Sequence, residues 1–215
     1  MILKRLKVLT ELGEYTNCYI IHDEFSKETM VIDPGAEVEK IVQMLDIMGA
    51  KLKYIYLTHC HADHSGGASK LREIKGGKII IHRFDCNALL DDSISLGTYI
   101  GMQPVYLKAD SRIDDNDVIH IGKLEFKVLH KPGHTKGATC LYCKEEKLLF
   151  SGDTLFRGTW GRTDLPTGGF EEIINSIMEK LMCLPDDTIC YPGHGKSTKI
   201  GEEKPIYLQL SARKD

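Results

Sequence analysis

Hydrophobic and polar positions along this chain follow the periods of strands and helices in turn. Short runs rich in β-branched, aromatic and aliphatic residues predict strands, because turn residues separate them. We expect strands at residues 2–9, 18–21, 29–32, 52–57, 78–82, 118–121, 124–129, 139–143, 147–150 and 188–191. Two neighbouring pairs of these runs predict hairpins, one around Gly122-Lys123 and one around the charged segment 144–146.

Helical periodicity is clearest after Gly169, where apolar residues recur every three or four positions from Phe170 to Met182. Glu171 and Glu172 in the first turn and Pro185 beyond the end fit the two termini of such a helix. Shorter helices are expected at residues 38–48, 68–75 and after residue 194. Residues 84–101 give mixed signals, which we interpret as a helix followed by a loop.

Strands dominate both halves of the chain, and each half has its own helices. This distribution predicts two sheets packed face to face with helices outside, an α/β fold of the four-layer αββα sandwich type. A length of 215 residues suits one well-cored domain, so we expect a single domain over residues 1–215.

The composition fits an ordinary globular protein, with 42% hydrophobic and 27% charged residues. A net charge of -3 predicts no nucleic-acid partner, and no segment is long and apolar enough to predict a signal peptide or a membrane partner. Seven cysteines without a disulfide-framework spacing predict a reducing, cytoplasmic location. Cys140 and Cys143 would face opposite sides of a strand and are not expected to form a site together. The sequence contains no signal for the oligomeric state.

A run of metal-binding residue types, Thr-His-Cys-His-Ala-Asp-His-Ser-Gly-Gly, follows the strand at 52–57. His59 and His61 would point to one side if the chain is still extended there, and two converging imidazoles are typical of a transition-metal site. Asp63 and His64 are adjacent, so a turn would be needed to direct both at a second position. Ser65 and the two glycines after it allow a bend into the following helix.

Three more polar residues each follow a predicted strand and a glycine: His134, Asp153 and His194. A glycine at a strand end permits the sharp turn that would place the next side chain at the sheet edge. Together with the first run they make seven nitrogen or oxygen donors, the number needed for two metals that share a carboxylate.

The whole set resembles the metallo-β-lactamase superfamily, whose signature is His-x-His-x-Asp-His followed by a distant His, Asp and His. The resemblance implies the αββα fold of that superfamily and a centre with two metals. It implies that one metal is held by His59, His61 and His134, the second by Asp63, His64 and His194, and that Asp153 bridges them. The remaining histidines match no ligand position and are interpreted as structural or surface residues: His22, His82, His120 and His130.

Within the superfamily, segments 152–164 and 192–195 are most similar to the short hydroxyacylglutathione hydrolases, the glyoxalase II group. That resemblance implies hydrolysis of a small-molecule thioester, such as S-lactoylglutathione, by a metal-bridging hydroxide that Asp63 orients. It implies two divalent transition-metal ions as cofactors, zinc first, with iron or manganese as alternatives. Arg162 matches a basic residue that contacts the glutathione part of the substrate, although Asp164 stands where the family has a nearby tyrosine. A separate helical carboxy-terminal domain, which full-length members use for glutathione, is not expected here.

Two other functions stay open. A persulfide dioxygenase of the same superfamily would bind a single Fe(II) through His59, His134 and Asp153. A non-catalytic metal-binding module is a weaker alternative, because seven donors exceed what a scaffold needs. The β-lactamases of this fold lack a bridging Asp at position 153, so antibiotic hydrolysis is not expected. Flavodiiron proteins have Glu where His61 stands, and the tRNA-processing nucleases add an RNA-binding arm and a basic surface that this sequence lacks.

Overall fold

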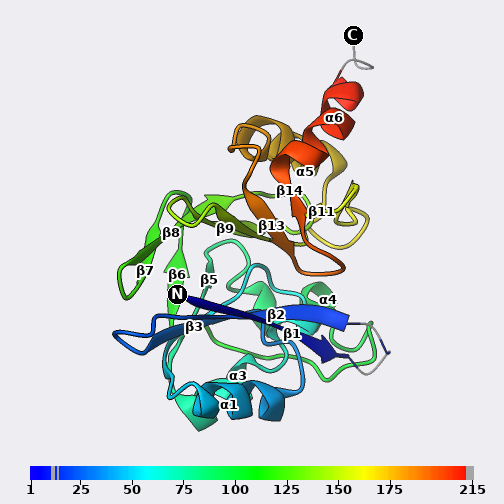
Figure 1. The fold of residues 1–215 in the computed structure, drawn as a ribbon. Coiled ribbons are helices and arrows are strands. Elements are labelled where there is room, and N and C mark those ends of the chain that lie inside the picture. Colours follow the sequence, from blue (N-terminus) through cyan, green and yellow to red (C-terminus); the bar gives the residue numbers. More distant parts are fainter. Residues whose placement is uncertain (11–12, 14, 212–215) are drawn as a thin grey trace.

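The computed structural model describes residues 1–10, 13 and 15–211 as two β-sheets packed face to face with helices on both outer sides (Figure 1). The predicted domain also includes residues 11, 12, 14 and 212–215, which lie outside the described part. Among the described residues, no helix combines the length and the hydrophobicity needed to cross a lipid bilayer.

The first sheet has six strands in the order β1-β2-β3-β4-β5-β6. Their bounds are β1 (Ile2–Leu9), β2 (Tyr15–His22), β3 (Glu28–Ile32), β4 (Lys51–Tyr56), β5 (Lys78–His82) and β6 (Ser111–Ile113). Strands β3 to β6 are parallel, so the chain must cross over between them. The crossovers contain α1 (Val38–Ile47) and α3 (Ala68–Lys75), and the carboxyl ends of the parallel strands share one sheet edge.

The second sheet also has six strands, in the order β14-β13-β10-β9-β8-β7. Their bounds are β7 (Val118–Ile121), β8 (Leu124–His130), β9 (Thr139–Cys143), β10 (Leu148–Gly152), β13 (Ile189–Pro192) and β14 (Thr198–Lys199). A small hairpin of β11 (Leu155–Phe156) and β12 (Thr159–Trp160) and the helix α5 (Phe170–Ser176) lie between β10 and its parallel neighbour β13. Helix α6 (Ile200–Ser211) ends the described chain.

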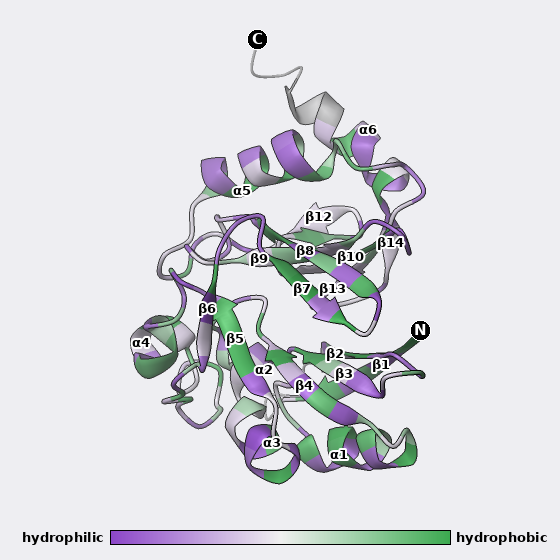
Figure 2. Ribbon diagram, turned by 90° about the vertical axis from the view of Figure 1, so that its left-hand side faces the viewer, coloured by the Kyte–Doolittle hydropathy of each residue, from purple (hydrophilic) through white to green (hydrophobic). Residues whose placement is uncertain are grey.

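Hydrophobic side chains fill three layers, as the predicted sandwich requires. Ile41 and Leu45 of α1 pack on the outer face of the first sheet, and Phe126 and Phe150 lie between the sheets. Ile173 of α5 packs on the outer face of the second sheet. Figure 2 shows mostly hydrophobic strands between helices that expose polar turns. The predicted αββα sandwich is therefore confirmed.

The predicted helices and strands agree best with the structure where the hydrophobic pattern extends over several residues. Both predicted hairpins form, and α3 and β5 have the predicted bounds. Cys140 and Cys143 lie in different core layers, as expected for opposite faces of β9. The helix predicted up to Met182 is α5 followed by a π-helical turn at Ile177–Leu181.

The structure differs from the predictions where elements are very short. Strands β6, β11, β12 and β14 have two or three residues, too few to show an alternating pattern. The segment 84–101 contains a 3₁₀ turn at Ala88–Leu90 and one helical turn, α4 (Asp92–Ser95), rather than a full helix.

Candidate metal centre

The seven donors predicted from the sequence come from loops at the ends of four strands. His59 and His61 follow β4, and Asp63 and His64 lie on the single helical turn α2 (Ala62–Ser65). This turn is the bend that the adjacent positions of Asp63 and His64 require. The other three follow β8, β10 and β13, and they are His134, Asp153 and His194.

Three overlapping groups of these donors have ligand atoms within 4.8 Å of one another. They are a first group of His59, His61 and His134, a second group of Asp63, His64 and His194, and a set that links the two, His59, His64 and Asp153. The structure thus brings all seven donors to one place, between the two sheets at the carboxyl ends of their strands.

In the first group, His61 Nδ1 lies 3.1 Å from His59 Nε2 and 3.0 Å from His134 Nε2. All three side chains are at most 4% exposed. Three nearly buried ring nitrogens therefore converge on one small volume.

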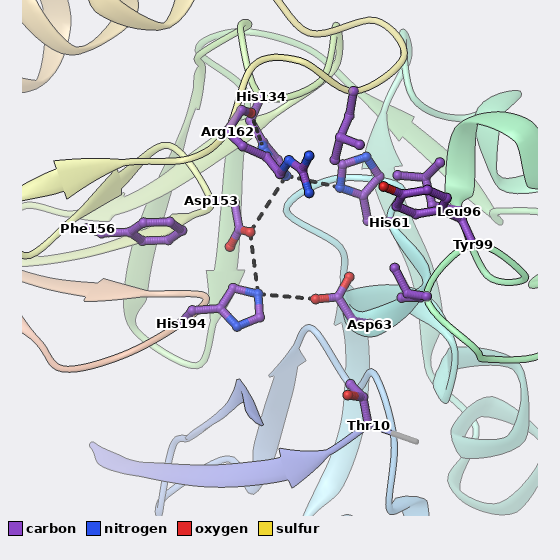
Figure 3. Close-up of a pocket in the computed structure, with 12 residues that line it drawn as sticks. Thr10, His61, Asp63, Leu96, Tyr99, His134, Asp153, Phe156, Arg162 and His194 are labelled. Atoms are coloured by element: carbon purple, nitrogen blue, oxygen red, sulfur yellow. Dashed lines mark hydrogen bonds and ion pairs between the residues drawn. The ribbon is translucent and has the colours of Figure 1, made fainter. Parts of the chain in front are cut away.

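In the second group, His194 Nε2 lies 3.1 Å from Asp63 Oδ2 and 3.3 Å from His64 Nε2. Asp153 lies between the groups, with Oδ2 3.6 Å from His134 Nε2 and 3.4 Å from His194 Nε2 (Figure 3). One carboxylate therefore contacts histidines of both groups.

The outer nitrogens of two rings are fixed by hydrogen bonds to backbone carbonyl groups. His134 Nδ1 is 2.8 Å from the Arg162 carbonyl oxygen, and His194 Nδ1 is 2.9 Å from the Tyr15 carbonyl oxygen. Since a carbonyl only accepts, both Nδ1 atoms donate, and each Nε2 faces the cluster, where a bound metal could take the place of a proton. Such outer partners orient histidines for metal binding.

Asp33 is a buried carboxylate that sequence reasoning did not assign to the site. Its Oδ2 lies 2.9 Å from His64 Nδ1 and accepts from the Thr58 hydroxyl at 2.7 Å. The same hydroxyl oxygen lies 3.0 Å from His59 Nδ1. Asp33 therefore orients His64 directly and His59 through Thr58.

Asp85 is a second buried carboxylate that sequence reasoning missed. Its Oδ2 accepts from the Cys60 backbone N–H at 3.0 Å and from the Thr135 hydroxyl at 2.6 Å, and its Oδ1 accepts from the Gly137 N–H at 2.7 Å. Cys60 lies between two donors, and Thr135 follows His134 in the chain. Asp85 thus ties the loop after β4 to the loop after β8.

Two glycines allow the backbone to approach the donors. Gly152 has φ 49°, a left-handed conformation that places Asp153 at the turn. A Cβ on Gly193 would lie 2.2 Å from Asp153 Oδ1 and 2.5 Å from His64 Cε1. Side chains at both positions would push the donors apart.

The two groups differ in charge. Burial, followed by the neighbouring rings, lowers the pKa of His59 and lowers that of His61 to about 3, so both are neutral at pH 7. Burial opposes ionisation of Asp63, but His64 and His194 outweigh it and hold the pKa of Asp63 low. Burial also opposes protonation of His194, but Asp153 and Asp63 raise its pKa to about 9.

Two observations indicate that these residues can bind divalent metal ions. Within the described residues, Asp153 Oδ1 is buried without a hydrogen-bond partner, which is unfavourable unless another group is bound nearby. Several contacts also join nitrogen to nitrogen, so protons are needed to make them favourable. A divalent cation can replace those protons, as metal binding does at histidine sites.

A cavity of about 540 Å³ opens over the donors and is lined by five of them. Phe156 lies on one flank of the donors, and Leu96 and Tyr99 lie on the opposite flank (Figure 3). Arg162 also lines this cavity. Leu96 and Tyr99 come from the segment 84–101, whose mixed sequence pattern indicated no functional role.

The four histidines interpreted as structural or surface residues lie outside the donor groups. His22 Nδ1 pairs with the Thr29 hydroxyl at 2.8 Å, and His82 stacks on His130 with ring centroids 4.0 Å apart. His120 is exposed beside Glu125.

Comparison with known proteins identifies the family. The sequence pattern that describes the metallo-beta-lactamase superfamily matches residues 12–194, which is most of the chain. The chain belongs to the metallo-beta-lactamase superfamily. Its members are mostly metallohydrolases, which agrees with a histidine and carboxylate cluster suited to metal ions.

The relatives of this chain within the superfamily carry different functional names. Hydroxyacylglutathione hydrolase GloC of Haemophilus influenzae is 36% identical over 190 residues, or 87% of this chain and 88% of that protein. A solved structure of BLEG-1, described as a B3 metallo-beta-lactamase, matches with a TM-score of 0.88 and 31% identity over 97% of this chain and 99% of its own. TTHA1623, solved in a di-iron-bound form, matches with a TM-score of 0.81 and 32% identity over 92% of this chain and 95% of its own.

Proposed function

We propose that this chain is a dinuclear metal-dependent hydrolase that cleaves a thioester, such as S-lactoylglutathione or a related hydroxyacyl thioester. The observation that carries the proposal is the convergence of seven nitrogen and oxygen donors around one shared carboxylate, at the floor of a cavity of about 540 Å³. The likeness to the Haemophilus influenzae hydrolase supports the thioester substrate.

In this proposal each donor has a defined place. His59, His61 and His134 would hold one metal, Asp63, His64 and His194 would hold the second, and Asp153, which contacts histidines of both groups, would be shared. Two bound metals would polarise the substrate carbonyl and make water nucleophilic near neutral pH. Zinc is our first candidate, with iron or manganese as alternatives, because imidazole and carboxylate donors suit all three.

Asp63 is in position to orient the attacking water. Its side chain is 19% exposed and lines the cavity, while its Oδ2 also accepts from the Thr16 hydroxyl at 3.2 Å. Because the pKa of Asp63 is held low, the carboxylate is ionised and accepts a hydrogen bond from a water in the cavity. That hydrogen bond orients the water so that a lone pair on its oxygen can attack the substrate.

The leaving group explains why a thioester suits this site better than an amide. A thiolate departs readily because its conjugate acid has a pKa of about 8.5. An amide nitrogen would need protonation as it leaves. The proposal gives none of the seven donors the role of protonating a leaving group, so an activated acyl group suits the site better.

Turnover under strict anaerobiosis with zinc alone tests this function. The zinc-loaded protein should release free thiol from S-lactoylglutathione, because zinc does not change oxidation state and hydrolysis needs no O₂. The persulfide dioxygenase is the second candidate, since His59, His134 and Asp153 also form a two-histidine, one-carboxylate set. The dioxygenase would replace the hydrolase as the proposed function if the protein consumes O₂ with glutathione persulfide, requires iron to do so, and keeps this activity in His194→Ala.

A β-lactam is a further substrate to test, because the BLEG-1 structure is 31% identical and carries a β-lactamase name. The zinc-loaded protein should cleave the lactam nitrocefin far more slowly than the lactoyl thioester, as measured by kcat/KM. The reverse order would assign antibiotic hydrolysis to this site.

A further inference from the structure

Arg162 and Asp164 form a two-pronged ion pair at the rim of the cavity. Arg162 Nε donates to Asp164 Oδ1 at 2.8 Å, and Nη2 donates to Oδ2 at 2.7 Å. The hydrogen bonds from Arg162 lower the pKa of Asp164 to about 2, so the carboxylate is ionised. The fork of the guanidinium is thus occupied by a carboxylate from its own loop.

The position of Arg162 is fixed at both ends. Its backbone carbonyl accepts the hydrogen bond from His134 Nδ1 at 2.8 Å, which ties it to the donor cluster. Asp164 holds its side chain and is the main group that raises the pKa of the guanidinium. Tyr99, on the opposite wall, raises this pKa further. The guanidinium is therefore held at the edge of the cavity that contains the donors.

A second cavity, of about 580 Å³, lies beside the first, with Arg162 in the lining of both and Asp164 in the lining of the second. Four residues line both cavities: Leu96, Tyr99, Arg162 and Leu165. The second cavity adds the side chains of Asp92 and Asp164. If the acyl group of a substrate lies at the donors, its thiol carrier would extend past Arg162 into the second cavity.

The charges at this junction do not favour an anionic carrier. A carboxylate on the carrier would have to compete with Asp164 for Arg162 Nε and Nη2, or approach a guanidinium whose charge Asp164, two residues away, already offsets. Asp92 lines the same space and would repel a negative group. Arg162 is the cation that the two linings share, and its charge is already compensated.

We propose that Asp164 determines substrate selectivity, by neutralising Arg162 so that the site prefers thioesters whose thiol carrier has no net negative charge. This inference rests on the proposed thioester hydrolysis. It assigns the second cavity to the carrier and gives Asp164 a role separate from the chemistry at the donors.

Two substrates with the same acyl group test the selectivity. S-lactoylglutathione has an anionic carrier, and the lactoyl thioester of N-acetylcysteamine has a neutral one. Wild-type, zinc-loaded protein should cleave the neutral ester with a kcat/KM at least equal to that of the anionic ester. In Asp164→Asn the freed guanidinium should lower KM for the anionic ester by about three- to tenfold, with a much smaller change for the neutral ester.

Two further variants make the test specific. Asp187→Asn removes one carboxylate from an equally exposed pair with Lys147, away from either cavity, and should not change the ratio of the two kcat/KM values. Arg162→Gln combined with Asp164→Asn should lose the gain for the anionic ester, because the gain requires the guanidinium.

The outcomes separate this proposal from the proposed function. Cleavage of both esters with an unchanged ratio in Asp164→Asn, or a wild-type preference of tenfold or more for the anionic ester, would overturn the role of Asp164 alone. Failure of wild-type protein to cleave either ester would overturn thioester hydrolysis itself, and the selectivity proposal with it.

Discussion

The donor cluster, meaning the seven histidine and aspartate donors, and the rim formed by Tyr99, Arg162 and Asp164 are built in opposite ways. The histidines of the first group are at most 4% exposed. The side chains of Arg162 and Asp164 are 54% and 68% exposed, and Tyr99 is 67% exposed. One region is closed by the two sheets, whereas the other lies in loops open to solvent.

The two regions also differ in how their charges are balanced. Buried carboxylates and histidines of the donor cluster compensate one another, and Asp33 and Asp85 fix the loops that carry them. At the rim a single exposed pair neutralises itself. The difference suggests that the buried region sets the reaction and the exposed rim sets the choice of substrate, so changes to the first should have much larger effects.

Loss of Asp63 should have the largest effect on activity. Asp63→Ala removes a donor of the second group and the carboxylate that orients water, so kcat for a lactoyl thioester should fall by about 10²–10⁴-fold. Asp187→Asn, a surface control, should keep wild-type kcat. A fall of less than about tenfold in Asp63→Ala would remove Asp63 from the catalytic role.

Loss of Asp85 should weaken metal binding without removing a ligand. Asp85→Ala leaves the Cys60 and Gly137 N–H groups and the Thr135 hydroxyl without their acceptor, so the two loops can separate. Affinity for zinc should fall by about 10- to 100-fold in a competition titration with a chelator. Asp85→Asn keeps an oxygen acceptor and should lose less. Equal affinity in wild type and Asp85→Ala would contradict the proposed link.

Lys131 sharpens the contrast, because it is a buried charge at which the effect of burial outweighs that of the nearby Asp115 carboxylate. It is 0% exposed, its Nζ donates to the His130 carbonyl oxygen, and burial lowers its pKa from 10.5 to about 8. The unfolded chain therefore binds more protons than the native chain between about pH 8 and 10.5, and this group makes stability rise with pH across that window.

Lys131→Met should accordingly raise the free energy of unfolding at pH 7, by about 2–3 kcal/mol. The advantage should shrink as the pH rises from 8 towards 10.5, as followed by urea unfolding of both proteins. A difference that stays constant over this range would show that the charge of Lys131 is not the cause.

Loss of Arg162 should have the smallest effect. Arg162→Ala leaves Asp164 unpaired at the rim, so KM for the anionic S-lactoylglutathione should rise by about three- to tenfold while kcat changes little. The lactoyl thioester of N-acetylcysteamine provides the comparison, because its carrier is neutral. An equal rise in KM for both esters would exclude a charge effect.

The donors could be predicted from the sequence, whereas the residues that orient them could not. The donors lie in one run and in three turns that each follow a strand, so local spacing singles them out. Asp33 and Asp85 act on residues at least 25 positions away, Thr58 and Cys60 respectively, and no local pattern contains such a partner. Their roles follow only from the packed sheets.

For the fold, prediction succeeded where alternation or helical spacing extends over several residues, as in β5, α3 and β9. It failed for β14, a two-residue strand held mainly by its pairing with β13. The segment 84–101 was the hardest, because its short turns are stabilised by contacts such as that of the Leu89 carbonyl with the Leu107 N–H.

The number of metal ions per chain tests the central claim most directly. Protein prepared with excess zinc and then freed of loosely bound metal should contain about two ions per chain by elemental analysis. His194→Ala should retain about one, and Asp153→Ala should lose metal from both positions, because that carboxylate is shared. One ion or fewer in the wild-type protein, or an unchanged content in Asp153→Ala, would contradict a dinuclear centre.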